Sequence, residues 1–415
     1  MRAVILSIGA ELVTGLRLDT HSADIARALT AVGIHVVRHE TVDDDVREIE
    51  EAFRVAAGEA DLVIATGGLG PTLDDCTRDA LAAAAGVPLQ ESPEAKAHLV
   101  AWAKACGRTL SESNFRQALL PRGAKVIPNP IGTAVGIEGR VAKAQVFVMP
   151  GVPAEMTRML SVEVLPHLRQ AAPGRATLIR TVRTHGVPES VVGEKLADLM
   201  APKRHPRIGT AVHGGMIDVH IYATGAPAEI APLLDADAAA VRRRLGDAVY
   251  GEGEERLENA VVALLAKRRA TIALAESITG GLVAAKLVNV PGISEFLLEG
   301  VVCYSNASKA RTVGVAEGLI SAHGAVSEPV ARAMAEGIRG RTGASVGVGV
   351  TGIAGPGGGT AEKPVGLVWF AVADTKGVVA AKEIFSGDRP LIRERAANYA
   401  LNLVRLRLLA LETRP

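Results

Sequence analysis

The chain has 415 residues, of which 48% are hydrophobic, 22% are charged and 3% are aromatic, and its formal net charge is +1. This length predicts two or three domains with aliphatic cores, and the near-neutral charge argues against a broadly basic nucleic-acid-binding surface. Three scattered cysteines and the lack of a long apolar run argue against disulfides, a zinc site and a membrane span, so we expect a cytoplasmic protein.

The first part of the chain alternates short apolar strands with amphipathic helices. Strands are expected at Val4–Ile8, Ile34–Val37, Leu62–Ala65 and Val146–Met149. Helices are expected at Ser22–Val32, Val46–Ala57, Leu73–Ala85 and Pro93–Ala105. This alternation predicts a mainly parallel sheet that is covered by helices on both faces.

Two shifts in composition, at residues 171–174 and 251–255, suggest where the domains meet. We therefore expect domains at residues 1–170, 171–252 and 253–415. The middle domain is expected to be a small α+β unit. Its elements are a hairpin of Arg207–Val212 with Met216–Ala223 and helices near Glu189–Leu199 and Pro227–Leu245.

The last part of the chain resumes the alternation of strands and helices. Strands are expected at Thr271–Ala275, Leu298–Cys303, Ser345–Val350, Val365–Ala373 and Val378–Phe385. Helices are expected from Leu257, near Leu282–Leu287, at Glu328–Arg341 and from about Pro390. The pattern predicts a third domain of the α/β class.

A glycine-rich loop follows the strand Leu62–Ala65 and precedes a helix. The loop residues that we expect to bind a ligand are Gly67, Gly68, Gly70 and Thr72. Glycines allow backbone N–H groups to approach an anion closely, and a helix N-terminus favours negative charge. The loop therefore predicts a phosphate-binding site.

Three aspartates are expected beside this loop. Asp44 follows the preceding strand, and Asp74 and Asp75 follow the glycines. Ligands of open α/β sheets bind beyond the carboxyl ends of the strands, so these carboxylates are predicted to converge there and to hold a divalent cation. Magnesium, manganese and cobalt are not distinguished. Helix capping is the alternative role, which we weigh equally for Asp74 and favour less for Asp75.

Ser277 lies directly after the strand Thr271–Ala275, and a serine needs a base to become a nucleophile. No histidine is well placed in the surrounding motifs. Lys309 is the candidate base, provided that burial lowers its pKa. Tyr304 is a candidate for relaying the proton or holding an oxyanion. The alternative is that Ser277 only caps the next helix.

Five further residues complete the predicted site around Ser277. The N–H groups of Gly280 and Gly281 begin a helix and are candidates for binding an oxyanion or a phosphate. Thr351 and the glycine-rich loop that includes Gly355 are candidates for a phosphate cradle. Arg389 is a candidate charge clamp. Glu276 is interpreted as orienting the backbone.

The whole chain resembles the competence/damage-inducible protein A (CinA) family, and its first part is similar to MoaB/MogA-type molybdopterin-binding domains. The matching segments are Gly9–Leu12, Asp19–Thr20, Asp44, Gly67–Thr77, Asn129–Ala134 and Pro150–Met156. The resemblance implies a three-layer α/β/α domain and a metal-dependent pyrophosphatase that converts ADP-ribose to AMP and ribose 5-phosphate. His21 departs from the asparagine that is usual in the family.

The last part of the chain resembles nicotinamide mononucleotide deamidase. The motifs lie in order at Ala275–Gly281, Tyr304–Lys309, Thr351–Pro356 and Gly387–Arg389. The resemblance implies metal-free hydrolysis of the nicotinamide carboxamide to nicotinate mononucleotide and ammonia. Carried over, Ser277 is the nucleophile or orders a water, and Lys309 activates it. Tyr304 and Thr351 are supporting groups of this catalytic set, and Arg389 contacts the substrate. Ile278 departs from a frequent cysteine.

The middle part resembles a KH-like fold but lacks the Gly-x-x-Gly loop that such domains use to bind RNA. A linker or dimerisation role is favoured, and we expect a homodimer that binds small nucleotides and neither nucleic acid nor membrane. The leading hypothesis is a bifunctional hydrolase of pyridine nucleotides. The alternatives are a deamidase with a ligand-binding first domain, and a non-enzymatic accessory of competence or recombination.

Overall fold

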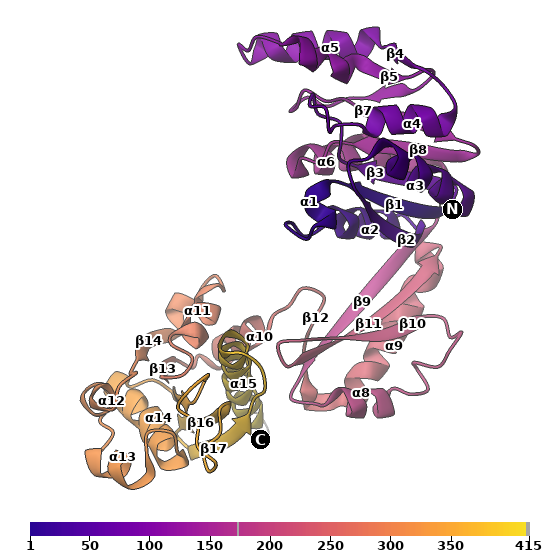
Figure 1. The fold of residues 1–415 in the computed structure, drawn as a ribbon. Coiled ribbons are helices and arrows are strands. Elements are labelled where there is room, and N and C mark those ends of the chain that lie inside the picture. The colour runs from indigo at the N-terminus through magenta and orange to yellow at the C-terminus, as the bar shows by residue number, and fades with distance from the viewer. Residues whose placement is uncertain (172–173, 412–415) are drawn as a thin grey trace. The chain divides into compact units, whose positions relative to one another are not determined.

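The computed structural model describes residues 1–171 and 174–411 of the chain (Figure 1). Two compact units are present, one formed by residues 1–171 and 174–178 with 223–232 and the other by residues 179–222 with the described residues from 233 onwards. The expected boundary at residues 171–174 includes residues 172 and 173, which lie outside the described residues. No helix of the described chain is long and apolar enough to span a membrane.

The first unit contains a six-stranded sheet in the order β2-β1-β3-β8-β7-β6. Its strands are β1 (Arg2–Ile8), β2 (His35–Val42), β3 (Leu62–Thr66), β6 (Lys125–Ile127), β7 (Gly136–Val141) and β8 (Ala144–Met149). The strands β2, β1, β3 and β8 run parallel, and β7 and β6 continue the sheet in antiparallel fashion. Four of the six strands are thus parallel, which confirms the expected mainly parallel sheet. The first strand, β1, lies between β2 and β3.

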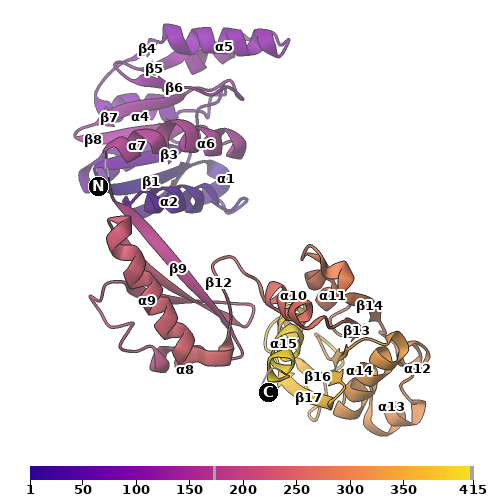
Figure 2. The same ribbon diagram turned by 180° about the vertical axis from the view of Figure 1, so that it is seen from behind.

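Helices cover both faces of this sheet (Figure 2). On one face lie α2 (His21–Ala31), α6 (Pro153–Met159) and α7 (Leu165–Ala171), and on the other lie α3 (Val46–Glu59) and α4 (Thr77–Ala85). The short α1 (Ala10–Val13) has no buried residue, and α5 (Pro93–Ala105) packs against residues 112–118. Side chains of β1 alternate between two cores: Val4 and Leu6 join the core that includes α3 and α4, whereas Ala3 and Ile5 join that of α2 and α6. This is the period-two alternation expected of a strand buried on both faces.

The remaining elements of this unit are short: β4 (Leu89–Glu91), β5 (Leu119–Pro121), η1 (Glu112–Ala118) and η2 (Leu160–Val164). One helix start differs from the sequence-based expectation, because α4 begins at Thr77 rather than at Leu73. The carboxylate of Asp75 accepts hydrogen bonds from the N–H groups of Gly70 and Thr72, both at 2.8 Å. These bonds hold residues 70–75 in a loop, so the helix begins only after it.

The middle sheet has the strand order β10-β11-β9-β12. Its elements are β9 (Ala176–His185), β10 (Arg207–His213), β11 (Met216–Gly225), β12 (Val249–Glu252), α8 (Glu189–Lys195), α9 (Pro227–Leu245) and η3 (Gly246–Ala248). The expected hairpin is confirmed, because β10 and β11 pair in antiparallel register from Arg207 opposite Tyr222 to His213 opposite Met216.

The C-terminal sheet has five strands in the order β14-β13-β15-β16-β17. They are β13 (Ile272–Glu276), β14 (Leu297–Val302), β15 (Val346–Gly352), β16 (Leu367–Asp374) and β17 (Gly377–Ile384). The strands β14, β13 and β15 run parallel, and β16 and β17 are antiparallel. Again the first strand of the domain, β13, lies between the next two strands of the parallel part.

Helices pack on both faces of this second sheet. They are α10 (Leu257–Arg268), α11 (Leu282–Val288), η4 (Ile293–Glu295), α12 (Asn306–Val313), α13 (Glu317–His323), α14 (Glu328–Thr342) and α15 (Arg389–Ala410). Ile272 and Leu274 of β13 point into the core with α10, α11 and α15, whereas Ala273 and Ala275 face α12, α13 and α14. The residues just after β13 therefore lie at the end of the sheet, between the helices that cover its two faces.

Candidate active sites

Ser277 and Lys309 meet at the carboxyl end of β13. The Nζ atom of Lys309 lies 3.0 Å from Oγ of Ser277. The same nitrogen lies 3.0 Å from each of the backbone carbonyl oxygens of Cys303 and Tyr304. Ser277 is 7% exposed and Lys309 only 1% exposed. Two residues that are 32 positions apart in the sequence thus form a buried pair.

The protonation state of Lys309 depends on its burial and on its hydrogen-bond partners. Burial lowers the pKa of Lys309 below the ordinary value of 10.5. A carbonyl oxygen only accepts hydrogen bonds, so two N–H groups of the amine are directed to Cys303 and Tyr304. A neutral amine then has a lone pair left, which is free to accept the hydroxyl proton of Ser277. This geometry is that of a serine next to its base.

The Ser277–Lys309 pair opens into a pocket of 170 Å³. Tyr304, Thr351 and Arg389 also line this pocket. The Arg389 guanidinium donates to the phenolic oxygen of Tyr304 at 2.9 Å and to the carbonyl oxygen of Gly355 at 2.8 Å. The hydroxyl of Thr351 donates to the carbonyl of Ala325 at 2.9 Å. The structure therefore brings all four expected catalytic side chains, and Arg389, to one pocket.

The two glycines after Ser277 have another role in this conformation. The N–H of Gly280 donates to the carbonyl oxygen of Ser277 at 3.1 Å, and the N–H of Gly281 donates to the Glu276 carboxylate at 3.0 Å. Neither glycine lines the pocket. Both have positive φ, +60° and +90°, which glycine adopts without strain. They shape the turn into α11, and their N–H groups are not available for an oxyanion.

Glu276 is a buried anchor for the start of α11. Its carboxylate accepts hydrogen bonds from the N–H groups of Gly281, Val283 and Ala284, at 2.9 to 3.1 Å. These are donors that a helix leaves unpaired in its first turn, and a negative charge there is also favoured by the helix dipole. Glu276 is only 1% exposed. The carboxylate therefore fixes the turn that carries Ser277.

We expect Glu276→Gln to lower the free energy of unfolding by about 1–3 kcal/mol, because the amide has only one acceptor oxygen for three buried donors. Urea unfolding of the full chain measures this change. Glu295→Gln is the matched control, since Glu295 is exposed. An unchanged unfolding midpoint in Glu276→Gln would contradict the anchoring role.

The glycine-rich loop of the first unit forms a second pocket, of 410 Å³. Its lining includes the expected residues Gly67, Gly68, Gly70, Asp44, Asp74 and Asp75. A Cβ atom on Gly67 would lie 2.1 Å from the carbonyl oxygen of Ile8, so the close approach of β1 requires glycine there. Thr72 does not line the pocket. Its N–H and hydroxyl bind the Asp75 carboxylate instead, the hydroxyl at 2.5 Å.

Negative charge gathers around Asp44. Burial raises the pKa of Asp44, a hydrogen bond from the N–H of Ala10 at 2.8 Å opposes this rise, and three nearby carboxylates add to it. Those carboxylates belong to Glu11, Asp43 and Asp74. Repulsion among them would be relieved by a bound cation.

The described residues do not form a complete metal cage. Among residues 1–171 and 174–411, no three His, Cys, Asp or Glu side chains are grouped closely enough to hold a metal ion. Magnesium, however, is commonly bound by one or two carboxylates together with substrate phosphates and water. The acidic residues around Asp44 fit an ion of this kind, which arrives with a phosphate ligand, and do not fit a site closed by protein ligands alone.

Four polar residues of this pocket were not predicted as site residues: Glu11, Gln117, Thr133 and Glu155. The amide nitrogen of Gln117 donates to the carbonyl oxygen of Leu69 at 3.2 Å and to the Thr133 hydroxyl at 3.1 Å. Glu155 accepts a hydrogen bond of 2.6 Å from Asn129. Thr133 and Glu155 lie in segments that carry the family resemblance. The resemblance of these segments was therefore the signal from which the two residues could have been predicted as site residues.

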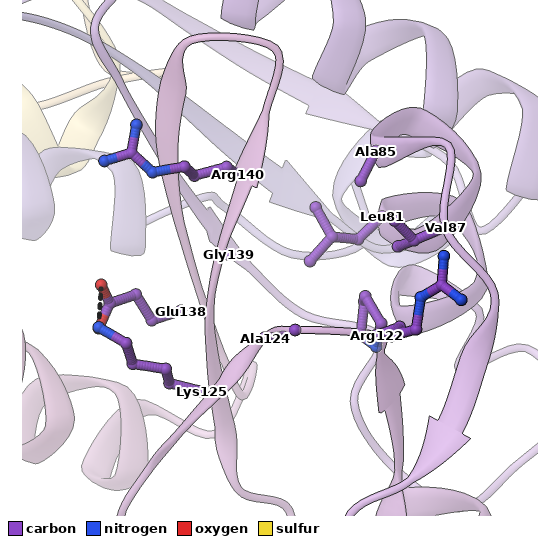
Figure 3. Close-up of a pocket in the computed structure, with 11 residues that line it drawn as sticks. Leu81, Ala85, Val87, Arg122, Ala124, Lys125, Glu138, Gly139 and Arg140 are labelled. Carbon is purple, nitrogen blue, oxygen red and sulfur yellow. Dashed lines mark hydrogen bonds and ion pairs between the residues drawn. The ribbon is translucent and has the colours of Figure 1, made fainter.

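A further hollow, of 340 Å³, lies between α4, the end of β5 and the hairpin of β6 and β7 (Figure 3). Its basic side chains are Arg122, Lys125 and Arg140. Lys125 pairs with Glu138 at 3.5 Å, and all three basic residues are exposed. None of the residues predicted for either site lines this hollow.

Comparison with protein families divides the chain into three matches. Residues 4–170 match a family described as "Probable molybdopterin binding domain", residues 179–251 match the "Damage-inducible protein CinA KH domain", and residues 254–408 match the "CinA C-terminal domain". The expected fold class, a MoaB/MogA-like domain, a KH-like domain and a C-terminal α/β domain, is confirmed.

Full-length relatives are similar over the whole chain. A CinA-like protein of Geobacter sp. (strain M21) is 43% identical, with 100% of this chain and 99% of the relative covered. A CinA-like protein of Frankia casuarinae is also 43% identical, over 99% of this chain and 96% of the relative. The crystal structure of a CinA protein of unknown function from Thermoplasma acidophilum is 37% identical, with 39% of this chain and 94% of that chain covered and a TM-score of 0.37.

Proposed function

Because the chain belongs to the CinA family, we propose that it is a bifunctional hydrolase of pyridine nucleotides. The C-terminal domain hydrolyses the carboxamide of nicotinamide mononucleotide and releases nicotinate mononucleotide and ammonia. The N-terminal domain cleaves ADP-ribose to AMP and ribose 5-phosphate. The observation that carries the proposal is the contact of 3.0 Å between the buried Lys309 amine and the Ser277 hydroxyl.

The deamidation begins at the Ser277 hydroxyl. Its oxygen attacks the carboxamide carbon while its proton passes to the neutral amine of Lys309. The C–N bond then breaks, the protonated lysine returns the proton to the leaving nitrogen, and ammonia departs. A water molecule, deprotonated by the same lysine, hydrolyses the resulting ester and regenerates Ser277. In the alternative course, Ser277 orients that water and the water attacks the amide directly.

The side chains around the pocket suit a negatively charged nucleotide substrate. The guanidinium of Arg389 is fixed by Tyr304 and by the carbonyl of Gly355, so its position is set before a ligand arrives. A preorganised arginine binds a phosphate without the loss of side-chain entropy that a mobile one suffers. We assign Arg389 to the phosphate and the Ser277–Lys309 pair to the carboxamide.

In the N-terminal domain, a divalent cation is assigned to Asp44 and Asp74, with the glycine loop as the phosphate cradle. When bound, such an ion neutralises phosphate charge and activates water. Asp75 is assigned to the loop itself, because its carboxylate already accepts hydrogen bonds from Gly70 and Thr72. Asp44 accepts one backbone N–H and has further lone pairs for the cation.

The two activities are expected to respond differently to EDTA. Ammonia release from nicotinamide mononucleotide should be unchanged, because the Ser277–Lys309 pair needs no metal. ADP-ribose cleavage should fall about 100-fold or more and return with added Mg²⁺ or Mn²⁺. Coupled ammonia and AMP assays on the same purified chain measure both rates.

Charge-neutral variants then locate the cation. Asp44→Asn should lose ADP-ribose cleavage and keep deamidation, whereas the exposed Glu51→Gln on α3 should lose neither. Ammonia release without ADP-ribose cleavage under any metal would favour the alternative of a deamidase with a ligand-binding first domain. Turnover of neither nucleotide would contradict the proposed function.

A further inference from the structure

A third pocket, of 250 Å³, adjoins the glycine-loop pocket of the first unit. The two pockets share Ile8, Glu11 and Gly151 as walls. The new pocket is otherwise lined by the loop before α2 and by the start of that helix, including Asp19 and His21. A ligand with a phosphate among the glycines would therefore place the neighbouring part of the molecule in this pocket.

Hydrogen bonds fix which nitrogen of His21 carries its proton. Oγ1 of Thr66 lies 3.1 Å from the carbonyl oxygen of Pro150, which only accepts, so the single hydroxyl proton of Thr66 is used there. Nδ1 of His21 lies 3.3 Å from the same Oγ1. The oxygen must accept this second bond, and Nδ1 must donate it. The neutral ring is then the Nδ1–H form, and Nε2 is an acceptor.

Nε2 of His21 has no hydrogen-bond partner among the residues that the structure describes. Thr66 is 2% exposed, so the donor side of the ring is locked inside the domain, whereas His21 itself is partly exposed and lines the pocket. The neighbouring Asp19 is not a competing donor: both its oxygens accept hydrogen bonds from Ser22. The pocket therefore presents a fixed, unpaired acceptor.

We propose that His21 is a specificity-determining residue that accepts a hydrogen bond from a sugar hydroxyl, and that this pocket holds the ribose attached to the phosphate in the glycine loop. The proposal rests on the nucleotide-hydrolase function proposed above. In ribose 5-phosphate the 3- and 2-hydroxyl oxygens lie three and four bonds from the carbon that carries the phosphate, which suits two pockets that share a wall. An oriented acceptor that has no partner within the protein discriminates against a ligand that lacks the matching donor.

The tautomer is measurable without any ligand. In the full chain labelled with ¹⁵N-histidine, long-range ¹H–¹⁵N spectra at about pH 8.5 should show His21 as the Nδ1–H form. Loss of the signal in His21→Asn assigns it. Thr66→Val removes the acceptor and should shift the ring toward Nε2–H. An Nε2–H ring in the unchanged protein would overturn the proposal.

Ligand binding tests the sugar contact. Calorimetry in the presence of Mg²⁺ compares ribose 5-phosphate with 2-deoxyribose 5-phosphate, and AMP with its 2′-deoxy and 3′-deoxy forms. In each pair the deoxy ligand should bind about tenfold more weakly than the ligand with the hydroxyl. His21→Ala should abolish this ratio for at least one pair, His21→Asn should retain part of it, and the exposed His39→Ala should leave it intact.

The outcomes separate this proposal from the one on which it rests. If His21→Ala binds the ribose compounds and prefers them over the deoxy compounds by the same factor as the unchanged protein, only the role of His21 would be overturned. No binding of any of these compounds, with or without Mg²⁺, would overturn both the sugar pocket and the N-terminal activity.

Discussion

Ser277→Ala is expected to abolish ammonia release from nicotinamide mononucleotide, with a fall in kcat of about 10⁴-fold or more, while ADP-ribose cleavage continues at the original rate. Loss of a nucleophile that acts together with its base removes most of the chemical acceleration. The change deletes one oxygen from a side chain that is 7% exposed, so its effect on the fold is small. Steady-state assays of both reactions measure the two rates.

Ser321→Ala is the matched control for this experiment, because Ser321 is an exposed serine of the same domain. It should leave both activities unchanged. A Ser277→Ala protein that keeps deamidation within tenfold would show that Ser277 is not the nucleophile. Loss of both activities would contradict the two-site model. Mass spectrometry of a quenched reaction distinguishes an acyl-enzyme on Ser277 from direct attack by water.

Lys309→Ala should be as damaging to deamidation as the loss of Ser277, because no second base contacts the Ser277 hydroxyl in the described chain. Lys309→Arg is the informative companion. It keeps a positive charge but provides no base near neutral pH, since arginine stays protonated. Both variants should be inactive, and a small primary amine added to Lys309→Ala should restore part of the rate. An active Lys309→Arg enzyme would assign the lysine an electrostatic role instead.

The pH dependence of the unchanged enzyme follows from the same amine. Burial lowers the pKa of Lys309, so the neutral form is populated at a lower pH than in an exposed lysine. The ratio kcat/KM for nicotinamide mononucleotide should therefore rise with pH through this lowered pKa and level off before the ordinary value of 10.5. A rate that falls over this range would indicate that the protonated lysine is the active form.

The expected pairing of Ser277 with Lys309 could be inferred from the sequence because both residues follow neighbouring parallel strands. Parallel strands end at one edge of a sheet, so residues after β13 and β14 are neighbours whatever lies between them. Most strands and helices were foreseen for a similar reason, since their apolar periodicity is a local property. The strands β4 to β7, β9 and β12 were not foreseen. For β9 and β12 the reason is that each becomes a strand only through its partners in the middle sheet.

What the sequence did not predict are the hydrogen bonds of individual carboxylates and N–H groups. Asp75 was expected to bind a metal, but its oxygens accept from Gly70 and Thr72 and shape the loop. The N–H of Gly281 was expected to face the substrate, but it donates to Glu276. Such choices depend on the side-chain and backbone directions of a folded turn, which residue type and spacing do not determine.

The strand order of the two α/β domains has a consequence for how their chemistry can change. In each domain the first strand lies between the next two strands of its parallel part. The connection from the first strand to the second therefore runs to one side of the sheet, and the connection that leaves the third strand, β3 or β15, runs toward the other side. The two connections diverge at the carboxyl ends of β1 and β13, and a crevice opens at this topological switch point. Ile8 and Ser277 mark the two places. The location of each site is therefore a property of connectivity, and only the loops decide what binds there. A change at a partly exposed position such as His21 can therefore shift the preferred ligand without moving the site.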